Sequence, residues 1–179
     1  MVLIYITGIS GAGKSAVLQE LQHRGYTAYG IDEDSIASFY RNDTDELFVD
    51  KIAPEDRTPE WRSRHTWKAK RETVQHLADE ATGKSVFLCG VTANDADELW
   101  DLFDYVFALT ISEEILKHRI QTRTTSDFGK NEHELTSLLE WQRTAAEDYK
   151  QLGATLIDAA RPLEKVVDEI VSMINVGSK

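Results

Sequence analysis

The sequence has few of the residues that mark secreted or membrane proteins. Cys89 is its single cysteine, so no internal disulfide can form, and we expect a reducing, cytoplasmic setting. No apolar run is long enough to cross a bilayer. The first apolar run lacks the basic flank of a signal peptide, so we do not expect it to be one.

Basic residues are also scarce. The 179 residues include 20 Lys and Arg against 31 Asp and Glu, a formal net charge of −11. Proteins that bind nucleic-acid backbones or anionic membranes usually carry a basic surface. We therefore expect neither partner. The length predicts one domain, large enough to bury a good core.

A glycine-rich segment near the N-terminus carries the strongest signal. It reads Gly8-Ile9-Ser10-Gly11-Ala12-Gly13-Lys14-Ser15, follows an apolar run and precedes a helical pattern. This is the phosphate-binding loop in its required strand–loop–helix context. Its backbone N–H groups and the helix start would hold phosphates, Lys14 would reach the β- and γ-phosphates, and Ser15 would ligate Mg²⁺. The residues expected to contact ATP are Gly8, Ile9, Ser10, Gly11, Ala12, Gly13, Lys14, Ser15 and Ala16.

Strands and helices alternate along the rest of the chain. Apolar runs predict strands at 2–6, 27–31, 85–89, 106–111 and 154–157. Helical patterns lie between them, including a possible start at 35–40, one long helix at 58–82 with Trp67, Val74 and Leu77 on its core face, and others beginning near 112, 132 and 162. Residues 41–59 look like an irregular insertion. The alternation predicts a parallel sheet covered by helices on both faces, with ligands at the carboxyl ends of the strands.

Two acids, Asp32 and Asp34, follow the second predicted strand and should lie beside the phosphate loop. In an extended segment, residues two apart share a side. One carboxylate would then support hydrated Mg²⁺ while the other takes the proton of an acceptor hydroxyl. In the alternative interpretation, Asp34 only caps a helix beginning at Ser35.

Arginines form a second candidate group. Arg119 and Arg123 share one face of a predicted helix, just before the polar segment 122–132. Guanidinium groups suit the dispersed charge of a transferring phosphoryl group, and a flap could carry them over the triphosphate. They could instead form a solvated edge that pairs with nearby glutamates. Arg143 is a weaker candidate on the following helix.

Basic residues also cluster between the second and third parallel strands, at Arg57, Arg62, Arg64, Lys68 and Arg71. They could hold an anionic acceptor, and Arg62 is our candidate contact. A solvated helix face would explain the same pattern.

On these residues the chain resembles the small P-loop kinases of the nucleoside-monophosphate-kinase-like group, which includes shikimate and gluconate kinases. The resemblance rests on the phosphate loop, the Asp32-x-Asp34 pair, the Leu116-x-x-Arg119-x-x-x-Arg123 helix and the Ile157–Leu163 strand–helix turn. It implies a three-layer α/β/α fold with a five-stranded parallel sheet, a substrate-binding segment after the second strand and a lid after the fourth.

The resemblance also implies roles for individual residues. Arg119 would pack near the adenine, Arg123 would touch phosphates from the lid edge, and Ala160, Arg161 and Pro162 would line the adenine pocket. Asp34 would bind the acceptor and act as base, and Asp32 would support Mg²⁺.

The chain departs from this group after the third parallel strand. The Asp-Gly-Phe-Pro-Arg-like signature of nucleoside monophosphate kinases is replaced by Cys89-Gly90-Val91-Thr92-Ala93-Asn94, and the triple glycine of shikimate kinases is absent. Neither a nucleotide nor shikimate is therefore supported as acceptor. Gly90 and Asn94 could shape a pocket for another molecule.

Other classes of nucleotide-binding protein fit less well. No Asn-Lys-x-Asp motif of a GTPase is present, and no buried strand ends in the acid typical of an ATPase motor, since Cys89-Gly90 and Ile111-Ser112 stand there. The hypothesis is an ATP- and Mg²⁺-dependent kinase of a small acceptor. The alternatives are a polynucleotide 5′-kinase and a non-catalytic nucleotide-binding regulatory module. We expect a core at 1–34, 84–121 and 150–179, a substrate-binding segment at about 35–83 and a lid at about 122–134.

Overall fold

The structure is a computed structural model, and it describes residues 2–50, 52–53, 56–80, 83, 85–124 and 128–176. Parts of the predicted core, insertion, long helix and lid, at 1, 51, 54–55, 81–82, 84, 125–127 and 177–179, lie outside the described residues.

A five-stranded parallel sheet forms the centre of the molecule, in the order β2-β5-β1-β6-β7. Its strands are β1 (Val2–Thr7), β2 (Thr27–Gly30), β5 (Ser85–Cys89), β6 (Tyr105–Thr110) and β7 (Thr155–Asp158). Each agrees with a predicted strand to within one residue at either end. The apolar runs identified these strands because a parallel sheet covered on both faces needs continuous apolar sequence.

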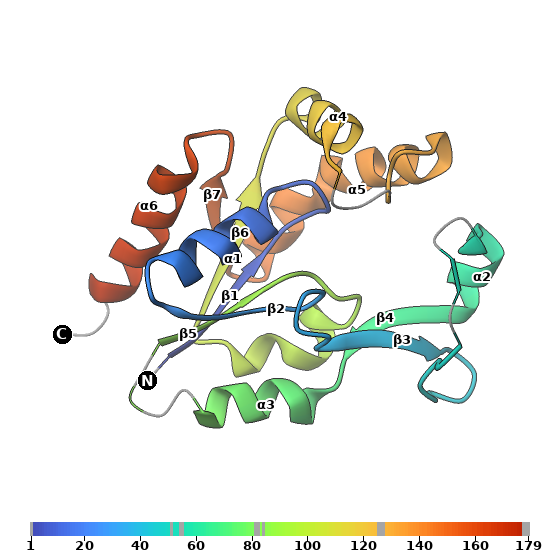
Figure 1. The fold of residues 1–179 in the computed structure, drawn as a ribbon, viewed down its shortest axis with the longest axis horizontal. Helices are drawn as coiled ribbons and strands as arrows, with labels where there is room; N and C mark the ends of the chain where they lie inside the picture. The colour runs from blue at the N-terminus through green and yellow to red at the C-terminus, as the bar shows by residue number, and fades with distance from the viewer. Residues whose placement is uncertain are drawn as a thin grey trace.

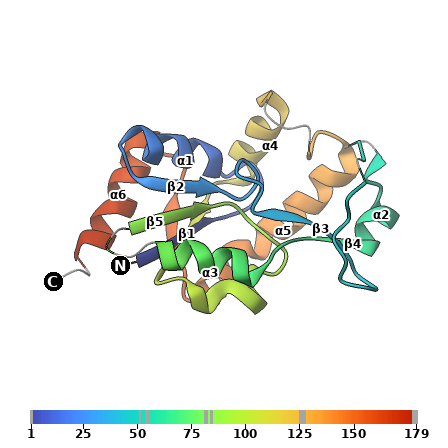
Figure 2. The same cartoon turned by 60° about the horizontal axis from the view of Figure 1, so that its bottom comes forward.

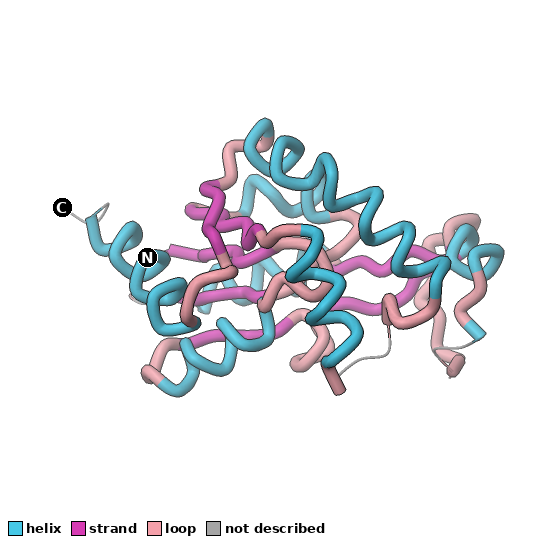
Figure 3. Tube along the Cα trace, turned by 90° about the horizontal axis from the view of Figure 1, so that it is seen from above, coloured by secondary structure: helices cyan, strands magenta, loops and turns pink. Residues whose placement is uncertain are grey.

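Helices cover both faces of this sheet, as the alternation predicted (Figure 1). They are α1 (Lys14–His23), α3 (Arg71–Glu80), α4 (Glu113–Thr122), α5 (Glu132–Gln151) and α6 (Leu163–Val176), with a π-helical turn at Asp95–Leu99 and a 3₁₀ turn at Trp100–Leu102. Figure 2 shows α1 and α6 on one side of the sheet and α3 on the other. Viewed from above, the magenta strands lie between the cyan helices (Figure 3).

The core has two parts because side chains alternate across β1. Ile4 and Ile6 pack with buried residues of α1 and α6, namely Val17, Leu18, Leu21, Val166, Val167, Ile170 and Ile174. On the other face Leu3 and Tyr5 pack with residues of α3 and the π turn, namely Val74, Leu77 and Leu99.

The segment between β2 and β5 differs from the prediction. It holds β3 (Ala37–Arg41), the short helix α2 (Pro59–Arg64) and β4 (His65–Ala69), and β3 pairs with β4 in an antiparallel hairpin. Figure 1 shows this hairpin projecting from the main sheet toward α2.

The predicted helix at 35–40 is therefore wrong, and the predicted helix at 58–82 is two helices with a strand between them. The predicted start is confirmed, because Thr58 caps α2 by accepting a hydrogen bond from the Trp61 N–H. His65 then adopts extended backbone angles, and Trp67 lies opposite Phe39 in the hairpin with ring centroids 4.9 Å apart. Trp67, Val74 and Leu77 fit a helical period in sequence, yet Trp67 belongs to a strand because cross-strand pairing with β3 decides its structure.

Candidate active site

The phosphate loop joins β1 to α1, and its glycines have a steric reason. Gly8, Gly11 and Gly13 adopt φ angles of 137°, 91° and 114°, which L side chains rarely adopt. A Cβ on Gly8 would also lie 2.7 Å from the carbonyl oxygen of Leu109. The loop therefore needs glycine at these places, and α1 begins directly after it at Lys14.

The side chain of Lys14 folds back into the phosphate loop that precedes it. Its Nζ donates hydrogen bonds to the carbonyl oxygens of Gly8, at 2.7 Å, and Ile9, at 2.9 Å. Burial lowers the pKa of Lys14 from 10.5 to about 8; the positive charge of Arg123 lowers it further and the carboxylate of Asp32 opposes the shift. The ammonium group is thus poorly solvated and faces a negative charge, which suits it to bind phosphate oxygens.

Two arginines from the end of α4 meet the same loop. Arg119 donates from Nη1 to the Ala12 carbonyl and from Nη2 to the Ala159 carbonyl, both at 2.8 Å. Arg123 donates from Nη1 to the Ser10 Oγ at 3.2 Å. Arg119 thereby ties the phosphate loop to the turn after β7, and the structure brings both predicted arginines to the nucleotide side of the sheet.

The Asp32–Asp34 segment is a turn, so the expected extended alternation is wrong. The Asp34 N–H donates to the Gly30 carbonyl at 2.9 Å, and the Asp34 carboxylate accepts from the Gly30 N–H at 2.7 Å. Ser35 has a φ of 55° and ends the turn, and β3 follows instead of a helix. Asp34 therefore fixes its own turn and caps no helix.

The carboxylates of this turn interact electrostatically with Lys14 of the phosphate loop. Burial and then the charge of Glu33 raise the pKa of Asp32, while Lys14 opposes the rise. The negative charge of Glu33 also raises the pKa of Lys14, a role that sequence reasoning missed. In the sequence, only the position of Glu33 between two aspartates could have indicated its effect on Lys14.

The predicted metal ligands are oxygen donors. Ser15 is exposed at the start of α1, and Asp32 comes from the turn beside Lys14. Carboxylate and hydroxyl oxygens are ligands that Mg²⁺ accepts, usually together with phosphate oxygens and water. In the described part of the chain no group of three or more His, Cys, Asp or Glu is placed to hold a metal ion.

Gly90 and Asn94, the predicted acceptor residues after β5, have structural roles. A Cβ on Gly90 would overlap the side chain of Ile31. The buried Asn94 side chain donates to the Ala69 carbonyl and to Glu98, both at 2.9 Å, and accepts from the Ala69 N–H at 3.3 Å. These contacts hold the loop after β5 against β4.

Residues 4–139 match the model of a protein family, AAA_18, described as an AAA domain. The chain belongs to this AAA domain family. No curated protein matches the chain. Similar solved structures include a gluconokinase from Sinorhizobium meliloti 1021, with 18% identity, a TM-score of 0.53 and coverage of 99% of this chain and 98% of that one.

Two further structures share the fold of this AAA domain protein. Shikimate kinase from Acinetobacter baumannii in complex with shikimate has 16% identity and a TM-score of 0.62, covering 99% of this chain and 95% of that one. Deoxyadenosine kinase from M. mycoides has 16% identity and a TM-score of 0.56, covering 97% and 98%. The fold is thus that of the small P-loop kinases, as the resemblance based on the phosphate loop, the Asp32-x-Asp34 pair and the Arg119–Arg123 helix implied. None of the helices in the described ranges is long and apolar enough to span a membrane.

The basic cluster of this AAA domain protein is dispersed. Three members form separate ion pairs, in which Arg64 pairs with Glu60, Lys68 with Asp45 and Arg71 with Asp101. Arg57 and Arg62 instead line one pocket beside the start of α5.

Other predicted residues lie farther from the loop or face away from it. Arg143 is exposed on α5, where its charge helps to lower the pKa of Glu113 at the start of α4. The Arg161 side chain pairs with Glu169 on α6, and its Nε donates to the Asp158 carbonyl at 3.0 Å, so Arg161 joins α6 to the end of β7.

Proposed function

We propose that this AAA domain protein is an ATP- and Mg²⁺-dependent kinase that transfers the γ-phosphoryl group directly, in line, to a small acceptor. The supporting observation is the convergence on one loop of Lys14, Arg119 and Arg123, with Asp32 acting on Lys14. Phosphoryl transfer needs cations around the equatorial phosphate oxygens and a carboxylate near the metal. The names of the neighbours, gluconokinase, shikimate kinase and deoxyadenosine kinase, support a small-molecule acceptor.

Each polar group has a role in this proposal. Lys14 and Arg123 stabilise charge on the transferring phosphoryl group, and Arg119 fixes the loop against the base-binding turn. Ser15 and Asp32 would hold Mg²⁺, which would supply positive charge against the phosphates when bound. Asp34 orients the acceptor hydroxyl and accepts its proton as the new O–P bond forms and ADP leaves. The hydrogen bond from the Gly30 N–H supports Asp34 in this role because it fixes the carboxylate.

The substrate-binding segment and the lid are also part of the proposal. The hairpin and α2 belong to the segment at about 35–83, which would bind the acceptor, and Arg62 would be one of its contacts. Arg123 and Glu134 belong to the lid at about 122–134. The ion pair between Arg62 and Glu134 supports the idea that both segments border the acceptor.

The pairing of the basic residues bears on the polynucleotide alternative. A polynucleotide needs a continuous row of free cations to follow its phosphates. In this protein Arg64, Lys68 and Arg71 are each paired with an acid. We therefore favour a small acceptor over a 5′-hydroxyl strand.

The decisive experiment measures ADP release from MgATP across a panel of acceptors. The panel contains nucleoside monophosphates, nucleosides, sugar acids, shikimate and short 5′-hydroxyl oligonucleotides, with Lys14→Ala as the blank. We expect one class of small acceptor to stimulate ADP release, and Asp34→Asn to keep ATP affinity while abolishing transfer. Full transfer by Asp34→Asn would refute the assignment of the base. ATP binding without stimulation by any acceptor, and without an effect of Asp34→Asn, would indicate the regulatory module.

A further inference from the structure

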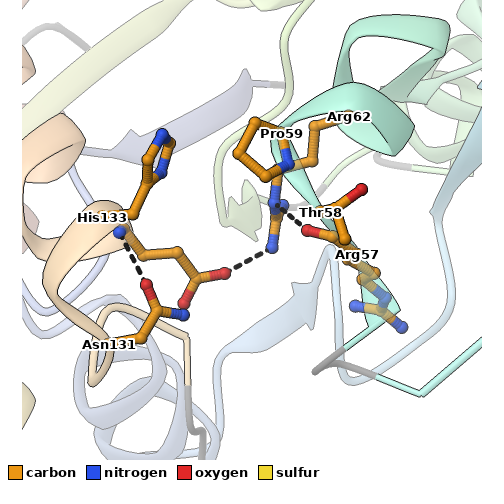
Figure 4. A pocket seen from close by; sticks show the side chains of 7 residues that line it. Arg57, Thr58, Pro59, Arg62, Asn131 and His133 are labelled. Carbon is orange, nitrogen blue, oxygen red and sulfur yellow. Dashed lines mark hydrogen bonds and ion pairs between the residues drawn. The ribbon is translucent and has the colours of Figure 1, made fainter.

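A small pocket lies between α2 and the start of α5, with a volume of about 170 Å³. Figure 4 shows its lining side chains, which come from two segments far apart in the sequence. They are Arg57, Thr58, Pro59, Arg62, Asn131, His133 and Glu134. Two arginines and one glutamate are among them.

An ion pair between Arg62 and Glu134 joins the two sides of this pocket. The Arg62 Nη2 lies 2.7 Å from the Glu134 Oε1, and the two side chains are 32% and 13% exposed. The other carboxylate oxygen of Glu134 accepts the Gly129 N–H at 2.8 Å. The Arg62 guanidinium also lies over the Phe128 ring, 4.9 Å from its centroid. Glu134 is thus held in place and neutralises Arg62.

Arg57 is the second cation of the pocket, and no carboxylate among the described residues forms an ion pair with it. Its guanidinium lies over the Phe39 ring at 5.2 Å, and its buried Nε–H finds no acceptor within the described ranges. Figure 4 shows the Arg62 side chain directed toward α5 and the Arg57 side chain directed to the other side. Burial and the nearby charge of Arg62 lower the pKa of Arg57, and the charge of Glu134 opposes the shift, so the three charges are close enough to interact.

We propose that Glu134 determines which anion the acceptor site accepts. Its one negative charge offsets one of the two guanidinium charges and leaves one positive charge among the described side chains of the pocket, so that the site takes a monoanion such as a carboxylate and rejects a dianion such as a phosphate monoester. This inference deepens the proposed kinase function and rests on it, because the pocket is an acceptor site only if the protein is a kinase. It assigns an acceptor class, a hydroxyl compound with one carboxylate.

Charge explains why a neutral residue at this place would reverse the preference. A carboxylate beside the bound anion repels a dianion about twice as strongly as a monoanion, and the low local dielectric makes the difference large. Replacing Glu134 by Gln keeps the side-chain shape and removes this repulsion. It also frees a second guanidinium for the extra charge of the dianion.

The experiment titrates acetate and sulfate, as a monoanion and a dianion, at constant ionic strength with MgADP on the phosphate loop. Binding is followed at the ¹⁵N–¹H resonances of the Arg57 and Arg62 Nε groups, which report this pocket and not the phosphate loop. In the wild type we expect sulfate to bind no more tightly than acetate. In Glu134→Gln we expect sulfate to gain about tenfold in affinity and acetate to gain clearly less.

Two control variants separate charge from structure. Glu132→Gln makes the same substitution at an exposed position of the same helix turn, and Glu134→Asp keeps the charge. Both should keep the wild-type ratio of sulfate to acetate affinity. The inference is overturned if Glu134→Gln leaves that ratio within twofold of wild type, if the wild type already prefers sulfate tenfold, or if neither anion shifts the Arg57 resonance. Failure of the kinase function would appear separately, as no acceptor-stimulated ADP release, because this titration requires no transfer.

Discussion

Replacing Lys14 by Met should stabilise the protein at neutral pH while removing its ability to bind nucleotide. Burial holds the pKa of Lys14 at about 8 in the folded chain, against an ordinary 10.5. Between these two values the unfolded chain binds a proton that the folded chain has released, so stability rises with pH in this window. Below pH 8 both states carry the charge, and the folded state bears the full cost of burying it.

The size of the effect follows from the two pKa values. A difference of about 2.5 corresponds to about 3 kcal/mol of destabilisation at pH 7, falling to about 1.4 kcal/mol at pH 9.5. Met removes this cost and also removes the two hydrogen bonds to Gly8 and Ile9, which are worth about 1 kcal/mol each after exchange with solvent. We expect Lys14→Met to gain about 1 kcal/mol at pH 7, and we expect the gain to have vanished by pH 9.5.

Urea unfolding of both proteins at pH 7, 8, 9 and 9.5 gives the difference directly. Burial raises the pKa of the Cys89 thiol, so each protein alone loses stability as its unfolded thiol ionises above pH 8.5. This loss cancels when the two proteins are compared at one pH. Lys165→Met is the matched control, because Lys165 is 71% exposed and should give no pH-dependent difference. A difference between Lys14→Met and wild type that stays constant from pH 7 to 9.5 would refute the reasoning.

The remaining predictions concern the loops around the site. Arg119→Lys should weaken MgATP binding about tenfold by calorimetry, because one ammonium cannot bridge the Ala12 and Ala159 carbonyls at once; unchanged affinity would show that the bridge is not needed. Gly90→Ala should lower the free energy of unfolding by about 1–3 kcal/mol in urea, because its Cβ meets Ile31; Gly90→Ala with Ile31→Val should recover part of the loss if overlap is the cause.

The nucleotide half of the site could be predicted because its information is local. The phosphate loop fixes its own conformation through glycines at 8, 11 and 13, and the strand and helix beside it are contiguous in sequence. The α4 arginines were found from helical spacing, and both contact the loop region. Ser112 and Asn131 cap α4 and α5 near the predicted starts, for the same local reason.

The segment from 35 to 83 was predicted poorly because its structure depends on distant pairing. No residue between Ser35 and Arg41 indicates that Phe39 pairs with Trp67 across two antiparallel strands, and a helical period fits Trp67 equally well. The turn at Asp32–Asp34 was missed because its decisive feature is a positive φ at Ser35, a residue that adopts this conformation only occasionally. Sequence patterns report propensity, and here tertiary contacts override it.

The same difference explains why the nucleotide is easier to infer than the acceptor. Nucleotide phosphates are held by one contiguous loop, whereas Arg62 and Glu134 meet across 72 positions of the sequence. Neither residue indicates the other: Asn131-x-x-Glu134 is an ordinary helix start, and Arg62 belongs to a basic run whose other members pair locally. The net charge of the pocket depends on that one long-range pair. If Glu134 sets the anion preference as proposed, a single substitution there would change acceptor choice without any change in the motif that identifies the fold.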